Sequence, residues 1–108
     1  MEFLTAGTTR DVSRAIEEYA TAAGHVHALV VPWESQGTTL SMAVTSVKAD
    51  GWAIEHTNLG TITLTERGDD LTGVAISAED PERLESPQLA AVFDRFAHQL
   101  RAKLAIVR

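Results

Sequence analysis

The residue whose type and setting best suit catalysis or ligand binding is His56. It follows Trp52 and Ile54 at alternate positions, so a strand here carries all three side chains on its apolar face. An imidazole in an apolar pocket can orient a bound ligand, or act as a general acid or base. The simpler interpretation is a core or rim histidine hydrogen-bonded to a backbone carbonyl, because buried polar groups are normally satisfied internally. We favour that interpretation.

Two further histidines, His25 and His27, are separated by one residue, which places both imidazoles on one face of a strand. That spacing occurs in metal sites, and Glu55 could complete a three-ligand set. The predicted strand rows separate Glu55 from the histidines, so a pair of surface histidines beside a turn is the favoured interpretation. The chain has no cysteine, which excludes disulfides, thiolate metal sites and cysteine nucleophiles. We therefore predict no metal site.

Other reactive residue types lack the pattern that their chemistry needs. Ser35 and Ser41 have no nucleophile elbow around them, and the chain has neither a P-loop nor a Gly-x-Gly-x-x-Gly phosphate loop. Asp94 and His98 are four residues apart, which is an ordinary surface pair on a helix. We therefore predict no catalytic residue and no cofactor, and the sequence favours a protein that is not an enzyme.

Length and charge limit the classes of function. A chain of 108 residues forms one domain, 1–108, with enough chain for one hydrophobic core. Nine basic residues against fifteen acidic ones give a net charge of −6, which argues against nucleic acid and anionic membrane surfaces as partners. No apolar run reaches the ~18 residues of a membrane span, and the first four residues lack a secretory signal pattern. We expect a cytoplasmic protein.

Residues 37–78 alternate between apolar and polar types with the period of two that indicates half-buried strands. We predict four strands joined by three-residue turns at 49–51, 58–60 and 68–70, with Asp70 in the left-handed conformation. The other face of the sheet is rich in threonine and can be solvated. In this register two rows fill the dry face: Val44, His56, Ile62 and Ile76, then Ser46, Ile54, Leu64 and Val74.

Two amphipathic helices flank this region. The first spans 10–23, is capped by Thr8 or Thr9, and is ended by Gly24. The second, longer helix begins at 86–87, where Ser precedes Pro. Their apolar stripes are Val12, Ile16, Tyr19 and Ala23 in the first helix, and Leu89, Val92, Phe93, Phe96, Leu100 and Leu104 in the second.

Two more strands complete the predicted sheet. Residues 2–5 form a short edge strand, and 25–32 form a strand that pairs with 38–44. The predicted fold class is therefore α+β: an antiparallel meander sheet of about five to six strands, covered on one face by a long C-terminal helix and an N-terminal helix.

The order of these elements resembles the helix-grip domains of the START/Bet v 1-like superfamily. The segments that carry the resemblance are 60–65 (GTITLT), 70–76 (DLTGVAI) and the helix 89–104. The superfamily includes polyketide cyclases and lipid-binding proteins, so the resemblance implies a small molecule held between the sheet and the last helix. This chain lacks the second short helix and the further pair of strands usual in the family, which argues against a large cavity. The family has no universal catalytic residues, so none is assigned.

Three functions are compatible with these features. The most favoured is the binding of an apolar small molecule, with a predicted lining of Met42, Trp52, Ile54, His56, Leu64, Phe93 and Phe96. The second is a protein-interaction module, a homodimer without a small-molecule site, because acidic α+β secretion chaperones have a similar size and charge. The third, an enzyme that uses His56 as acid or base, is the least favoured.

The dimer hypothesis depends on Leu29, Val31 and Trp33. In the predicted strand, Leu29 and Val31 point to the threonine-rich face, and an exposed apolar patch often marks a binding surface. The strand is also a candidate sheet edge, whose unpaired backbone groups invite a second chain. The alternative is internal: residues 2–5 or the first helix cover this face, and the patch is ordinary core.

Overall fold

The computed structural model describes residues 1–24, 26–32, 35, 37–50, 53–80 and 87–104, with the backbone alone described for 47–50, 53–56 and 87. The elements, in chain order, are β1 (Glu2–Ala6), α1 (Thr9–Ala23), β2 (Val26–Val30), β3 (Thr39–Asp50), β4 (Ala53–Glu66), β5 (Leu71–Ala78) and α2 (Pro87–Leu104). This arrangement of strands and two helices confirms the predicted α+β class.

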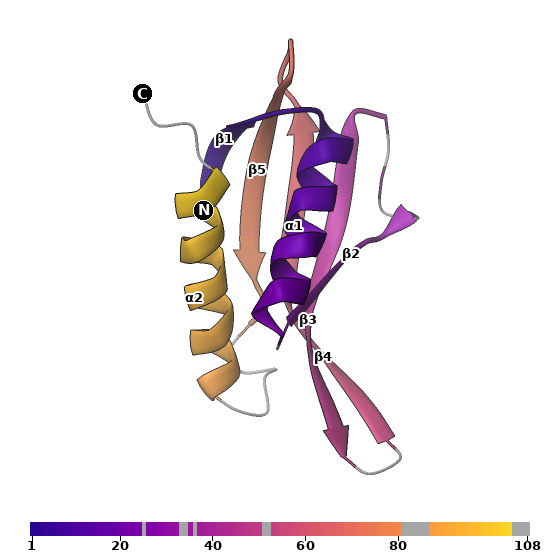
Figure 1. The fold of residues 1–108 in the computed structure, drawn as a ribbon, viewed down its shortest axis with the longest axis vertical. Helices are drawn as coiled ribbons and strands as arrows, with labels where there is room; N and C mark the ends of the chain where they lie inside the picture. Colours follow the sequence, from indigo (N-terminus) through magenta and orange to yellow (C-terminus); the bar gives the residue numbers. More distant parts are fainter. Residues whose placement is uncertain (25, 33–34, 36, 51–52, 81–86, 105–108) are drawn as a thin grey trace.

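The five strands form one open antiparallel sheet in the order β1-β5-β4-β3-β2. The strands β2 to β5 follow one another as a meander, and β1 pairs with β5 at the edge opposite β2. Both helices pack on the same face of the sheet (Figure 1). We call this helix-covered face the inner face and the opposite one the outer face.

The inner face is apolar because alternate residues of the strands point toward the helices. On the outer face, Thr61, Thr63, Thr65 and Ala75 stay partly exposed, as the predicted threonine-rich face requires. Apart from Leu59, the buried apolar residues that the strands contribute to the inner face are Val26, Ala28, Met42, Val44, Ile62, Leu64, Val74 and Ile76.

The hairpin of β4 and β5 has the predicted register. Ile62 lies opposite Ile76, and Leu64 lies opposite Val74. Asp70 occupies the left-handed region with a φ of 54°, which confirms the conformation predicted for the turn. Aspartate tolerates that region better than most residues, so the sequence signal was specific.

The predicted break at 58–60 is wrong, because β4 continues through it as one strand of 14 residues. Val44 pairs with Gly60 while Thr45 pairs with Asn58, so Leu59 is the extra residue of a β-bulge. Leu59 is fully buried and contributes to the core. A glycine inside a strand pattern can indicate a turn, a β-bulge or a close approach of another group to the backbone. Gly60 indicates the bulge and the close approach, and not a turn.

The bulge accompanies a different register in the β3–β4 hairpin. Asp50 pairs with Ala53, so the predicted turn at 49–51 is wrong, and residues 51–52 between them lie outside the described part. The predicted neighbours Val44 and His56 are separated, since His56 pairs with Val47.

The helix α1 begins and ends at two of the predicted capping residues. The Thr8 hydroxyl oxygen accepts a hydrogen bond of 3.2 Å from the backbone N–H of Asp11, and Gly24 follows the helix with a φ of 83°. Ala23 was predicted in the apolar stripe but is exposed. The buried residues of the helix are Val12, Ser13, Ile16 and Ala20.

Tyr19 of α1 joins the two helices. Its ring centroid lies 5.6 Å from that of Phe96, its hydroxyl donates to Gln99 Oε1 at 3.2 Å, and Lys103 Nζ lies 5.0 Å from the ring centroid. The hydroxyl of Thr5 donates to the carbonyl of Leu104 at 2.7 Å, which ties the end of α2 to β1.

No helix in the described ranges is long and apolar enough to cross a membrane. The buried residues of α2 are Phe93, Phe96, Ala97 and Leu100.

Candidate functional site

Three of the predicted ligand residues lie in the core between the sheet and the helices. Met42 and Leu64 are fully buried, and Phe96 is 3% exposed and packs against Tyr19. Protein interiors are close-packed, so side chains without accessible surface leave no space beside them for a second molecule. These three residues therefore form part of the packed core beneath the surface.

A hollow of about 420 Å³ lies between α2 and β5, and we call it the α2 hollow. Phe93 is the described residue that belongs both to this lining and to the lining predicted from the sequence. The volume falls within the range of roughly 300 to 1,000 Å³ that small-molecule sites occupy. The lining consists of Met1, Ile76, Ala78, Ala90, Phe93, Asp94 and Ala97.

Small side chains on α2 create this space. Ala90 and Ala97 are two helical turns apart, so they lie on the same side of the helix, with Phe93 between them. Ile76 and Ala78 supply the wall on the sheet. A larger side chain at position 90 would occupy the hollow directly.

The polar groups of the α2 hollow lie at its rim. Asp94 is exposed, and its carboxylate Oδ1 lies 3.5 Å from Nδ1 of His98, which confirms the predicted surface pair. The amino group of Met1 donates to the carbonyl of Ile76 at 3.1 Å. No buried side-chain nitrogen or oxygen in the described part lacks a hydrogen-bond partner. The hollow can therefore hold an apolar group, and its described lining offers no buried acid or base for catalysis.

The remaining members of the predicted sites fall largely outside the described part of the structure. The side chains of Trp52, Ile54 and His56 lie outside it, and so do His25 and the side chain of Glu55. Among the described residues there is no group of three or more histidine, aspartate or glutamate side chains that could hold a metal ion.

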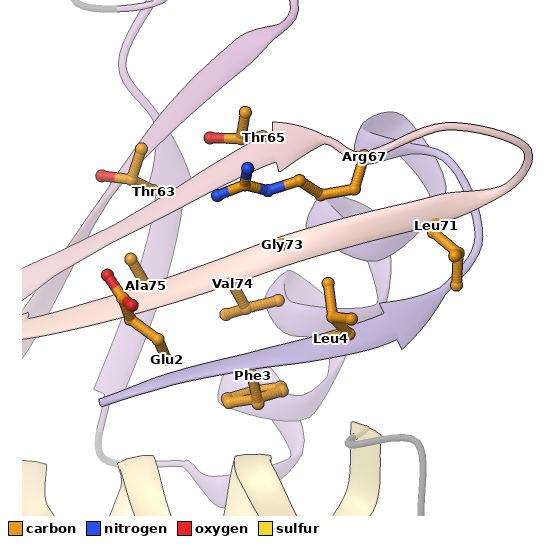
Figure 2. Close-up of a pocket in the computed structure, with 10 residues that line it drawn as sticks. All are labelled: Glu2, Phe3, Leu4, Thr63, Thr65, Arg67, Leu71, Gly73, Val74 and Ala75. Carbon is orange, nitrogen blue, oxygen red and sulfur yellow. The ribbon is translucent and has the colours of Figure 1, made fainter. Parts of the chain in front are cut away.

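A second hollow, of about 430 Å³, lies on the outer face over β1, β5 and β4, and we call it the outer hollow (Figure 2). Gly73 and Ala75 form its floor, because neither has a side chain beyond a methyl group. Its lining consists of Glu2, Phe3, Leu4, Thr63, Thr65, Arg67, Leu71, Gly73, Val74 and Ala75.

Arg67 lies across this floor. A β-carbon built on Gly73 would lie 2.9 Å from Nε and 3.3 Å from Cγ of Arg67, so the arginine side chain rests on the glycine. Figure 2 shows the guanidinium group reaching back along the sheet beside Thr65. Within the described ranges, the side chains of Arg67 and Glu2 take part in no hydrogen bond and no ion pair.

Arg67 and Gly73 are not among the site residues predicted from the sequence. The available signal was the register of β4 and β5, which places Thr65 opposite Gly73 and brings Arg67 to the end of the same hairpin. A glycine in a strand whose neighbours are threonine and valine indicates a close approach by another group, and that group is the arginine side chain.

The strand β2 forms one edge of the sheet, and Leu29 is 59% exposed on its outer face. Residues 2–5 lie at the opposite edge and α1 lies on the inner face, so neither covers Leu29 and the internal alternative is wrong. Val31 is half-buried, and its carbonyl accepts a hydrogen bond of 2.8 Å from the hydroxyl of Ser35. Trp33 lies outside the described residues.

The chain matches no protein-family model, no curated protein and no solved structure. The resemblance to helix-grip domains therefore stays a prediction.

Proposed function

We propose that this chain is a binding domain that holds an apolar small molecule in the α2 hollow. The observation that carries the proposal is the hollow itself, a space of about 420 Å³ between α2 and β5. Apart from Met1, its apolar lining is Ile76, Ala78, Ala90, Phe93 and Ala97. Small-molecule sites are concave and mostly apolar with a few polar groups that fix orientation, and Asp94 is the polar side chain at this rim.

The helix-grip resemblance supports the same position for the ligand. In that superfamily the ligand lies between the sheet and the last helix, and the α2 hollow lies between β5 and α2. This support is an analogy at the level of the fold, and the chemistry of the lining is the independent support. A cytoplasmic location and a role outside catalysis belong to the same proposal.

A fluorescence titration with N-phenyl-1-naphthylamine, a neutral apolar probe, tests the site. Ala90→Leu puts a branched side chain into the α2 hollow, and we expect it to weaken probe binding by at least about tenfold, because the added side chain occupies space that the probe needs. The control is Ala91→Leu, which adds the same atoms at an exposed position of the same helix. This control should bind the probe as the wild type does.

Both variants should unfold at the denaturant concentration of the wild type, because position 90 faces the hollow and position 91 faces solvent. Equal probe affinity in Ala90→Leu and Ala91→Leu would show that the probe binds elsewhere. A wild-type protein that gives no fluorescence enhancement at saturating probe would refute the proposal.

A second candidate function is a homodimeric interaction module, and the exposure of Leu29 favours it. Leu29 is the most exposed large apolar side chain in the described part, and it lies on an edge strand whose outer backbone groups have no strand partner there. Two copies that met here would bury both features around a two-fold axis. The test is the oligomeric state of Leu29→Thr.

A further inference from the structure

The outer hollow carries two opposite charges over a shallow floor. Arg67 rests on Gly73, and Glu2 belongs to β1, where it pairs with Ala75. In Figure 2 the Glu2 carboxylate and the Arg67 guanidinium group both rise from the outer face. We propose that this hollow binds a small zwitterion of the ω-amino acid type, with its carboxylate on Arg67 and its ammonium group on Glu2. The proposal is independent of the α2 hollow.

The arginine end of the hollow suits a carboxylate. A guanidinium group presents a planar fork of donors that matches a carboxylate with two parallel hydrogen bonds. The hydroxyl groups of Thr63 and Thr65 line the same side of the hollow and can donate as well. Among the described residues, the side chain of Arg67 has no hydrogen-bond or ion-pair partner, so a ligand carboxylate would not have to displace a described protein group.

The position of Glu2 decides which carboxylate fits. The Arg67 side chain passes over Gly73 and Glu2 pairs with Ala75, so the two charged side chains lie over positions of β5 that are about 7 Å apart along the strand. A second negative charge on the ligand would meet Glu2 in a protein of net charge −6 and would be repelled. A ligand ammonium group at that distance from the carboxylate would instead be attracted.

The middle of the hollow suits a short methylene chain. Its floor is Gly73 and Ala75, and Leu4, which is 48% exposed, forms the wall on β1. A methylene chain laid between the charges would cover part of the Leu4 side chain and remove apolar surface from water. The class of ligand that fits all three parts therefore has a carboxylate, a few methylene groups and an amine.

An NMR titration of the amide signals with three probes of matched length tests this inference. The probes are 6-aminohexanoate, hexanoate and hexylammonium. We expect 6-aminohexanoate to shift the amide signals of Gly73 and Ala75 and to bind at least about tenfold more tightly than either singly charged probe, since it makes one more charge-assisted contact. Equal binding of all three probes, or no shift at Gly73 and Ala75, would overturn the inference.

Two variants assign the charges, and a third serves as the control. Arg67→Gln should weaken 6-aminohexanoate binding by at least about tenfold, and Glu2→Gln should reduce it to the affinity of hexanoate. Arg14→Gln removes the same charge from an exposed position on α1, away from the outer face, and should leave binding unchanged. If Arg14→Gln weakens binding as much as Arg67→Gln does, the effect is one of net charge and the proposed site is wrong.

The result of the 6-aminohexanoate titration can be distinguished from the result of the probe titration of the α2 hollow. The probe for the α2 hollow is neutral and apolar, and Ala90→Leu, which blocks it, should not change the binding of 6-aminohexanoate. Shifts from 6-aminohexanoate confined to Ala90 and Ala97 would place that ligand in the α2 hollow and contradict the inference.

Discussion

The ring of Phe93 lies directly against the backbone of Gly60. A β-carbon on Gly60 would lie 2.5 Å from Cζ and 2.9 Å from Cε1 of that ring, and 2.5 Å from the carbonyl oxygen of Ser77. Gly60 follows Leu59, the bulged residue of β4, and so the irregularity in the strand lies where Phe93 of α2 contacts the sheet. The same contact holds Phe93 at the wall of the α2 hollow.

Gly60→Ala should destabilise the protein by about 1–3 kcal/mol in denaturant unfolding, because the added carbon meets a packed ring and a backbone carbonyl that cannot move freely. The control is Gly73→Ala on the neighbouring strand, where the added carbon meets the flexible side chain of Arg67. We expect that variant to stay within about 0.5 kcal/mol of the wild type. Equal losses at the two positions would contradict the close contact between Gly60 and Phe93.

Phe96→Ala should destabilise the protein by about 3–5 kcal/mol, because Phe96 is 3% exposed and its removal leaves a cavity beside Tyr19. The adjacent residue Arg95 is exposed on the same helix, and Arg95→Ala should change the free energy of unfolding by less than about 0.5 kcal/mol. A loss below about 1 kcal/mol for Phe96→Ala would mean that α2 does not pack on the sheet as described.

Leu29→Thr should leave the stability of the folded chain nearly unchanged, because the side chain is 59% exposed. If two copies meet at β2, light scattering should show a dimer in the wild type and a folded monomer in the variant. The control is Val26→Thr in the same strand, which is 1% exposed and should lower stability without a specific effect on mass. A wild type that stays monomeric at high concentration excludes the dimer.

Asp70→Gly should be as stable as the wild type or more stable by up to about 1 kcal/mol, because glycine has no side chain to oppose a φ of 54°. Asp70→Val should lose at least about 1 kcal/mol, since a branched β-carbon is poorly tolerated in that region. Thermal unfolding of both variants measures the difference. The reverse order of stability would show that the turn does not hold Asp70 in the left-handed conformation.

Local patterns in the sequence were sufficient for the fold class and for part of the register. The alternation of Ile62 and Leu64 with threonine fixes which face is buried, and the turn at 68–70 then aligns them with Ile76 and Val74. Thr8 and Gly24 likewise mark the ends of α1 through their own side chain and backbone conformation.

The register of β3 and β4 could not be predicted in the same way. Asn58 and Gly60 are residue types of both turns and bulges, and the choice between them depends on the burial of Leu59 and on the packing of Phe93 against Gly60 in three dimensions. The predicted pairing of Val44 with His56 followed from the three-residue turn predicted at 49–51, whereas Asp50 pairs with Ala53.

The two hollows depend on distances between elements, which a linear pattern does not contain. Ala90 and Ala97 look like ordinary helix-forming residues until α2 is placed against β5. Arg67 looks like an ordinary surface arginine until Gly73 is found beneath it on the next strand. Only Phe93 was predicted at a site and also lines a hollow in the described part of the structure.

The most direct test of the proposed function is an NMR spectrum of the alanine methyl groups during titration with N-phenyl-1-naphthylamine. The binding of this probe in the α2 hollow should shift the methyl signals of Ala78, Ala90 and Ala97, which line it, and leave that of Ala75 on the outer face unchanged. Shifts confined to Ala75, or no shift at any of the four at saturating probe, would contradict the account.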